Sequence, residues 1–92
     1  MKVRWTPTAL RDLESLDAYI SDNRPGAAAD PVDRIVTAIE GLRRYPEMGR
    51  KGRVADTREL VVTPFIVVYR LRKGVVELAA IMHGARRWPD SF

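Results

Sequence analysis

The last third of the sequence contains three apolar segments of strand length, and these segments constrain the fold more than any other feature. They run from Thr57 to Val62, from Phe65 to Leu71 and from Val75 to Met82. Thr63-Pro64 separates the first two, because proline cannot donate a hydrogen bond to a strand ladder. Lys73-Gly74 separates the last two, because glycine readily takes the positive φ of a tight hairpin turn. Both connections are too short for a crossover, so the pattern predicts an antiparallel meander.

The middle segment is apolar on both of its faces. Side chains alternate along a strand, so Phe65, Val67 and Tyr69 are expected on one face. Ile66 and Val68 are expected on the other. A strand of this kind belongs in the centre of a sheet, and each of its faces needs a cover.

The first part of the chain predicts a short strand followed by a helix. Residues Lys2 to Trp5 alternate in polarity. Thr6-Pro7 then offers an N-cap hydroxyl and a proline at the first helical position, where its missing N–H does no harm. Apolar side chains recur at helical spacing from there to about Ser21, where we expect the helix to end.

A second helix follows, and its start is open between two positions. Asp30-Pro31 offers a good N-cap and first turn, whereas a start at Gly26 would leave Pro31 to kink the helix. Arg43-Arg44 is expected in the last turn, near the negative end of the helix dipole, and Tyr45-Pro46 then stops the helix. Two amphipathic helices joined by a short loop predict an antiparallel hairpin.

The expected order is therefore β-α-α-β-β-β, an α+β fold in which the hairpin packs on one face of a mainly antiparallel sheet. We expect residues 1–92 to form a single domain. A helical hairpin covers only one face of a sheet. The second apolar face then predicts a protein partner or self-association.

Composition and charge narrow the classes of protein. No apolar run approaches the roughly 20 residues of a membrane span, and the N-terminus lacks the apolar core of a secretory signal. The chain has no cysteine, so a cytoplasmic location is the simplest interpretation. The net charge of +4 suggests nucleic acid or acidic protein segments as partners. One histidine and scattered carboxylates predict no metal site, and no cofactor is expected.

Two basic segments are candidate binding surfaces. The first is the glycine-flanked loop with Arg50, Lys51 and Arg53, and the second is the tail with Arg86, Arg87 and Trp88. Each has a simpler interpretation. In the simpler interpretation, the loop is only a solvated surface, and Trp88 only pins the tail against the sheet.

Because both segments are basic, a nucleic-acid-binding module is a further hypothesis. The chain matches no helix-turn-helix or RNA-recognition signature.

Metal-free RNA cleavage would need a base, an acid and cations at the phosphate. His83 is the only histidine, and Tyr69 lies on the middle strand. Arg58 and Arg70 are expected on neighbouring strands, and Arg86 and Arg87 follow just past His83. The simpler interpretation of His83, at the end of a strand, is a hydrogen-bonded structural residue.

Several parts of the sequence together resemble the RelE/ParE superfamily, the toxins of bacterial type II toxin–antitoxin modules. They are the order of elements, the Pro-Glu-Met-Gly-Arg turn from Pro46 to Arg50, the strand pair TRELVVTPFIVVYR and the closing IMHGARRWP. The resemblance covers essentially the whole chain. It implies a toxin that a cognate antitoxin neutralises through a segment that folds on binding. The apolar residues of the middle strand, 65–69, are the expected antitoxin contacts.

The resemblance allows two activities, poisoning of DNA gyrase by ParE-like members and ribosome-dependent mRNA cleavage by RelE-like members. The nucleases of this superfamily carry a basic residue near the start of the middle strand, where this chain has Phe65-Ile66. They also tend to place acid–base groups in the last few residues, and the tail from Arg86 to Phe92 has no histidine or tyrosine. The resemblance therefore favours a gyrase poison, with the basic loop and the tail as target contacts. A RelE-like mRNA endoribonuclease is the alternative.

Overall fold

The structure, a computed structural model, describes residues 1–23 and 29–92. The elements within these residues are β1 (Lys2–Trp5), α1 (Pro7–Asn23), α2 (Ala29–Gly41), β2 (Arg50–Lys51), β3 (Arg58–Val62), β4 (Phe65–Arg72) and β5 (Val75–His83). This order confirms the predicted β-α-α-β-β-β arrangement, to which the short strand β2 is added. No helix of the described residues has the length and apolar character needed to cross a membrane.

The strands form one five-stranded sheet in the order β1-β5-β4-β3-β2. Strands β3, β4 and β5 make the predicted antiparallel meander, and β1 pairs with β5 in parallel. The β4–β5 turn has positive φ at both central residues, 51° at Lys73 and 76° at Gly74. This is the pattern of a type I′ hairpin turn, which matches the twist of the strands. Strand β4 therefore lies at the centre of the sheet, as the sequence predicts.

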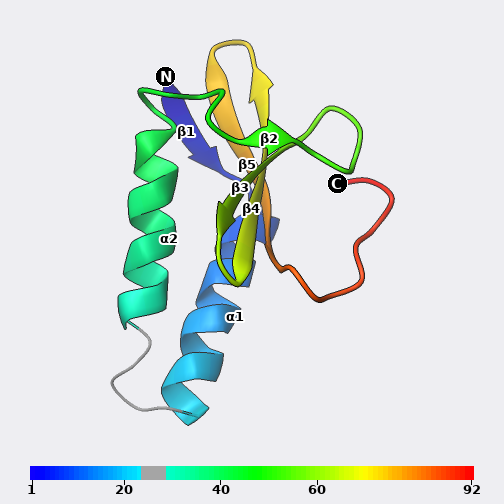
Figure 1. Ribbon diagram of the computed structural model, residues 1–92. Helices are drawn as coiled ribbons and strands as arrows, with labels where there is room; N and C mark the ends of the chain where they lie inside the picture. Colours follow the sequence, from blue (N-terminus) through cyan, green and yellow to red (C-terminus); the bar gives the residue numbers. More distant parts are fainter. Residues whose placement is uncertain (24–28) are drawn as a thin grey trace.

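Both helices pack on the same face of the sheet, which confirms the predicted hairpin packing (Figure 1). Thr6 begins α1 as expected, because its Oγ1 accepts a hydrogen bond from the Ala9 N–H at 3.2 Å. The buried core between the helices and the sheet consists of Ala9, Ile35, Ile39, Leu42, Leu60, Val67, Tyr69, Val76, Leu78 and Ile81. The alternation along β4 thus places Val67 and Tyr69 toward the helices.

The opposite face of the sheet is covered by the C-terminal tail, residues 84–92, which Figure 1 shows on the side away from the helices. A second buried cluster lies there and contains Ile66, Val68, Ala79 and Ala80. Trp88 and Phe92 pack against it from the tail. The sequence predicts a protein partner or self-association at this face, and in the isolated chain the tail covers it instead. Two aromatic side chains supply the cover, and Trp88 pins the tail against the sheet.

Three boundaries differ from the sequence prediction. Helix α1 continues to Asn23, and α2 begins at Ala29, one residue before the Asp30-Pro31 start. The alternative start at Gly26 lies outside the described residues. Helix α2 ends at Gly41 rather than near Arg44. The main chain tightens into i→i+3 bonds at that point, for example from the Arg44 N–H to the Gly41 carbonyl at 3.3 Å.

Candidate functional site

The basic loop is organised by a carboxylate that lies in strand β3. Glu59 is only 2% exposed, and its Oε1 accepts a hydrogen bond from Arg50 Nη2 at 2.9 Å. Its Oε2 accepts from the main-chain N–H of Arg53 at 2.8 Å and from Arg53 Nε at 3.1 Å. Arg50 and Lys51 form β2, which pairs with β3 at this point. The loop is therefore a structured edge of the sheet in which one carboxylate binds two of the three cations.

The same network extends to the tail. The guanidinium of Arg53 lies over the ring of Trp88, with Cζ 3.7 Å from the ring centroid. Burial alone would raise the pKa of Glu59, but the hydrogen bonds from Arg53 and Arg50 outweigh it and hold that pKa below its usual 4.5. Glu59 thus stays ionised near neutral pH and connects the loop, through Arg53, to the tail.

The Glu59→Gln variant is expected to lower the free energy of unfolding at pH 7 by about 1–3 kcal/mol, because an amide cannot satisfy both guanidinium groups. The pKa of Glu59 in the folded state lies below its ordinary value of 4.5. The ionised carboxylate therefore stabilises the fold fully at pH values above that ordinary value. This stabilisation is lost as the pH falls through the folded-state value. Urea unfolding between pH 7 and pH 3 measures this. The free energies of unfolding of the wild type and of Glu59→Gln should become more similar as the pH falls.

The matched control for this experiment is Glu14→Gln, which changes an exposed carboxylate on α1. Its effect on the free energy of unfolding should stay within about 0.5 kcal/mol. A Glu59→Gln deficit that stayed constant over the whole pH range would contradict the assigned ion pairs.

Tyr69 has a structural role that occupies its hydroxyl group. The side chain is fully buried, its hydroxyl donates to the Pro46 carbonyl at 2.7 Å, and it accepts from the Gly49 N–H at 2.9 Å. Burial raises the pKa of Tyr69, and the hydrogen bond from Gly49 only partly offsets this. Arg58 supports the same turn by donating to the carbonyls of Glu47 and Gly49 at 3.2 and 2.8 Å. Both residues therefore hold the connection between α2 and β2.

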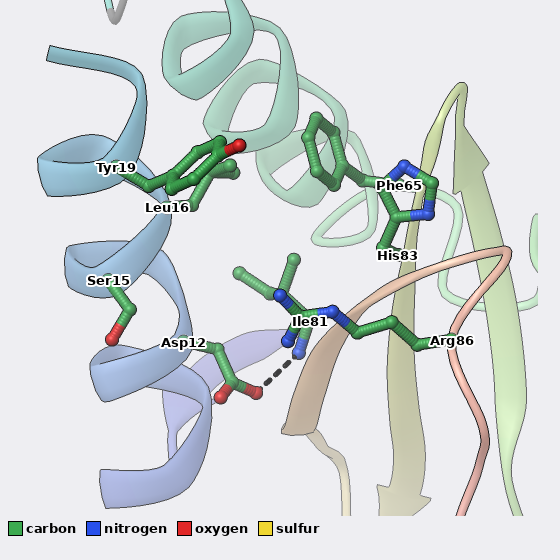
Figure 2. A pocket seen from close by; sticks show the side chains of 8 residues that line it. All are labelled: Asp12, Ser15, Leu16, Tyr19, Phe65, Ile81, His83 and Arg86. Atoms are coloured by element: carbon green, nitrogen blue, oxygen red, sulfur yellow. Dashed lines mark hydrogen bonds between the residues drawn. The ribbon is translucent and has the colours of Figure 1, made fainter. Parts of the chain in front are cut away.

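A pocket of about 560 Å³ opens between α1 and the ends of β4 and β5 (Figure 2). Its lining consists of Asp12, Ser15, Leu16, Tyr19, Phe65, Ile81, His83 and Arg86. Figure 2 shows aromatic and apolar side chains at one end and the Arg86 guanidinium reaching from the tail toward α1. The pocket therefore combines an apolar wall with one cation and one imidazole.

The strand edge beside this pocket is closed by a side chain. Strand β1 pairs with β5 only as far as Trp5 and Leu78, so the later residues of β5 lie at an edge. The Asp12 carboxylate accepts a hydrogen bond from the Ile81 N–H at 2.9 Å, the dashed line in Figure 2. An acidic side chain on α1 thus continues the hydrogen bonding where β1 stops.

His83 packs at the mouth of the pocket. Its ring meets Phe65 edge-on with the centroids 5.7 Å apart, and its Nδ1 accepts a hydrogen bond from the Ala85 N–H at 3.1 Å. The main-chain N–H of Arg86 donates to the His83 carbonyl at 3.0 Å. These contacts are those of a residue that shapes the turn from β5 into the tail.

The groups considered for RNA cleavage lie in separate places. His83 is paired with Phe65, and Arg70 lies five positions further along β4, so the two are roughly 16 Å apart along the strand and on opposite faces. Arg58 pairs with Tyr69, four positions along β4 from Phe65, the residue that pairs with His83. Along the strand direction, Arg58 is therefore roughly 13 Å from His83. Of these groups, His83 and Arg86 line one pocket together. The described residues also contain no group of three or more histidines, cysteines and carboxylates that could hold a metal ion.

The residues expected to contact an antitoxin are largely buried within the chain. Val67, Val68 and Tyr69 are fully buried and Ile66 is 6% exposed, while Phe65 is partly exposed in the pocket wall. Val67 and Tyr69 lie beneath the helices, and Ile66 and Val68 beneath the tail. A partner could reach the second pair only by displacing the tail.

The chain matches, over residues 3–88, the family described as ParE toxin of type II toxin-antitoxin system, parDE. It belongs to this toxin family. The protein named "Putative toxin Y4kP" of Sinorhizobium fredii (strain NBRC 101917 / NGR234) is 46% identical over 91 residues, which cover 97% of this chain and 94% of the relative. "Toxin RelE2" of Caulobacter vibrioides is 41% identical over 86 residues, which cover 92% of this chain and 97% of the relative. The toxin therefore matches a family described as ParE toxins and has a relative that carries a RelE name.

Solved structures agree with the fold of the toxin. A chain of the chromosomal ParDE TA system from P. aeruginosa superposes with a TM-score of 0.81 at 24% identity, covering 90% of the toxin and 95% of that chain. A chain of the toxin-antitoxin complex RelBE2 from Mycobacterium tuberculosis gives a TM-score of 0.66 at 24% identity, covering 89% and 95%. The resemblance to the RelE/ParE superfamily is confirmed, and the chain is the toxin of a type II toxin–antitoxin system.

Two important residues have no obvious sequence signal. The alternation with Leu60 assigns Glu59 to the tail face of the sheet. The sequence does not show its partners, because they lie in a loop that has no periodicity. Asp12 reads as an acidic residue near the start of a helix, where the dipole alone accounts for it. Its bond to Ile81 spans 69 positions in the sequence and depends on the tertiary fold.

Proposed function

We propose that the toxin acts in the bacterial cytoplasm as a poison of DNA gyrase and that a cognate antitoxin holds it inactive. The observation that carries the proposal is the separation of the candidate acid–base groups. Tyr69 is committed to the turn at Pro46 and Gly49, and Arg70 lies on the face opposite His83. A gyrase poison needs no bond-breaking groups of its own, because it only has to stabilise a complex of gyrase and DNA.

The target surface that fits this function is formed by exposed cations that are not already paired. Arg86, Arg87 and Lys51 are exposed, and in the described part of the chain their side chains form no ion pair. Arg50 and Arg53 share the carboxylate of Glu59, so they offer less net charge to a polyanion. Trp88 is engaged with Arg53 and the sheet. The contacts to gyrase and its DNA are therefore assigned first to Arg86 and Arg87, and then to Lys51 of the basic loop.

A RelE-like nuclease is the second candidate, and one specific arrangement favours it. His83 and Arg86 line the same pocket, together with the hydroxyl-bearing Ser15 and Tyr19. A general base and a cation could act there on a ribose and a phosphate that the ribosome positions. The relative named "Toxin RelE2" also bears the name of that branch.

Two assays with the purified toxin distinguish these functions. We expect the toxin to trap cleaved complexes of gyrase on supercoiled plasmid, and His83→Ala to retain that activity within about threefold, because the imidazole performs no chemistry in this mechanism. Translating ribosomes with a defined mRNA should yield intact message. Codon-positioned mRNA cuts that disappear in His83→Ala, with no trapped gyrase, would establish the nuclease instead.

A further inference from the structure

The pocket between α1 and the ends of β4 and β5 presents one carboxylate and one guanidinium that are not paired with each other. Asp12 and Arg86 both line it, and across residues 1–23 and 29–92 neither side chain forms an ion pair. Figure 2 shows Asp12 projecting from α1 and Arg86 reaching in from the tail. The volume of about 560 Å³ is that of a small-molecule site. Opposite charges that face one cavity suit a ligand that carries both signs.

Both charged groups have bonding capacity to spare. Asp12 Oδ2 accepts a hydrogen bond from the Ile81 N–H at 2.9 Å, which fixes the carboxylate at the strand edge. A carboxylate has about four lone-pair sites, so Asp12 can still accept from an ammonium group. The main-chain N–H of Arg86 donates to the His83 carbonyl at 3.0 Å, which fixes the turn that carries it. The guanidinium fork of Arg86 therefore remains for the two oxygens of a ligand carboxylate.

The third feature of the pocket is its apolar wall. Leu16, Phe65 and Ile81 line the same cavity as the two charged groups. The ring of His83 meets the ring of Phe65 edge-on with the centroids 5.7 Å apart, a favourable geometry that supports the aromatic part of the wall. An apolar side chain that leaves water for this wall gains free energy in proportion to its buried area. The ligand therefore has a large apolar group close to its two charges.

We propose that this pocket binds a free α-amino acid with a large apolar or aromatic side chain. Its carboxylate pairs with Arg86, its ammonium group pairs with Asp12, and its side chain packs on the apolar wall. A nucleotide lacks the cation, and its phosphate would be repelled by the Asp12 carboxylate. An internal peptide segment does not carry both charges on one carbon. The inference does not rest on the proposed function, because binding is measured on the free toxin.

A series of small molecules tests the proposal, with L-phenylalanine as the probe and main-chain amide chemical shifts as the readout. We expect the amides of Ile81, His83 and Arg86 to shift with a dissociation constant on the order of a millimolar, as expected for about twelve non-hydrogen atoms. N-Acetyl-L-phenylalanine, phenethylamine and glycine lack the ammonium group, the carboxylate and the apolar side chain in turn. Each should bind roughly tenfold more weakly or worse. Equal binding of any of the three would overturn the proposal, and so would the absence of shifts up to the solubility limit of L-phenylalanine.

Two variants locate the binding. Arg86→Met and Asp12→Asn should each weaken L-phenylalanine binding roughly tenfold or more, because a charge-assisted hydrogen bond is lost. Asparagine keeps an oxygen that can accept from the Ile81 N–H, so the fold should persist. The matched controls Arg87→Met and Glu14→Gln remove the same charges at exposed positions outside the pocket lining and should bind like the wild type. Wild-type affinity in both test variants, or equal losses in the controls, would overturn the proposal.

Discussion

The Gly49→Ala variant is expected to lose about 3 kcal/mol or more of its free energy of unfolding. A Cβ at this position would lie 2.6 Å from the Tyr69 hydroxyl oxygen and 3.0 Å from the Glu59 carbonyl oxygen. Tyr69 is fully buried, so its ring cannot move aside. The new methyl group would also break the hydrogen bond from the Gly49 N–H to that hydroxyl. Urea unfolding followed by circular dichroism measures the loss.

Gly41→Ala is the matched control. There an added Cβ meets only the Met48 methyl carbon, at an ordinary 3.6 Å. Gly41 is the last residue of α2, where alanine is the better helix former by up to about 1 kcal/mol. We therefore expect Gly41→Ala to be neutral or slightly stabilising. A loss below about 1 kcal/mol in Gly49→Ala would contradict the close packing of Tyr69 against this turn.

The parts of the fold that the sequence predicts are those with a local signal. The alternation from Phe65 to Tyr69 identifies the central strand, because both of its faces are apolar. Lys73-Gly74 marks the hairpin turn, since the structure needs positive φ there. Thr6-Pro7 marks the start of α1 through capping chemistry that involves only its neighbours. Each of these features is decided within a few residues, so pattern and structure agree.

The features that the sequence does not predict depend on residues that are distant along the chain. Strand β2 is only two residues long, too short to show a period, and it forms because β3 offers an edge. The tail contains Trp88 and Phe92 but no alternation that shows where they pack. Glu59 is a charged residue within an apolar strand, and only the fold brings Arg50 and Arg53 to it. The candidate site lies largely in these regions, which is why its geometry needed the structure.

The double variant Arg86→Glu/Arg87→Glu is expected to reduce gyrase poisoning by roughly 10- to 100-fold. Both side chains are exposed at the start of the tail, and Figure 2 shows that Arg86 reaches over the end of β5 toward Asp12. Neither side chain has a hydrogen bond or ion pair that stabilises the described part of the chain, so the fold should persist. Under the proposed function, the double change would replace two attractive interactions with DNA phosphates by two repulsive ones.

The measurement is the toxin concentration that gives half-maximal trapping of cleaved plasmid, repeated at several salt concentrations. Arg43→Glu/Arg44→Glu is the control, since it changes the net charge by the same amount in the turn after α2. The exposed ion pair of Arg43 with Glu40 contributes little to stability. We expect wild-type potency to fall steeply with salt and that of the tail variant to fall less, because fewer counterions are released. Equal losses in the two double variants would show that net charge alone matters. That result would remove Arg86 and Arg87 from the target surface, because a local contact should be sensitive to position.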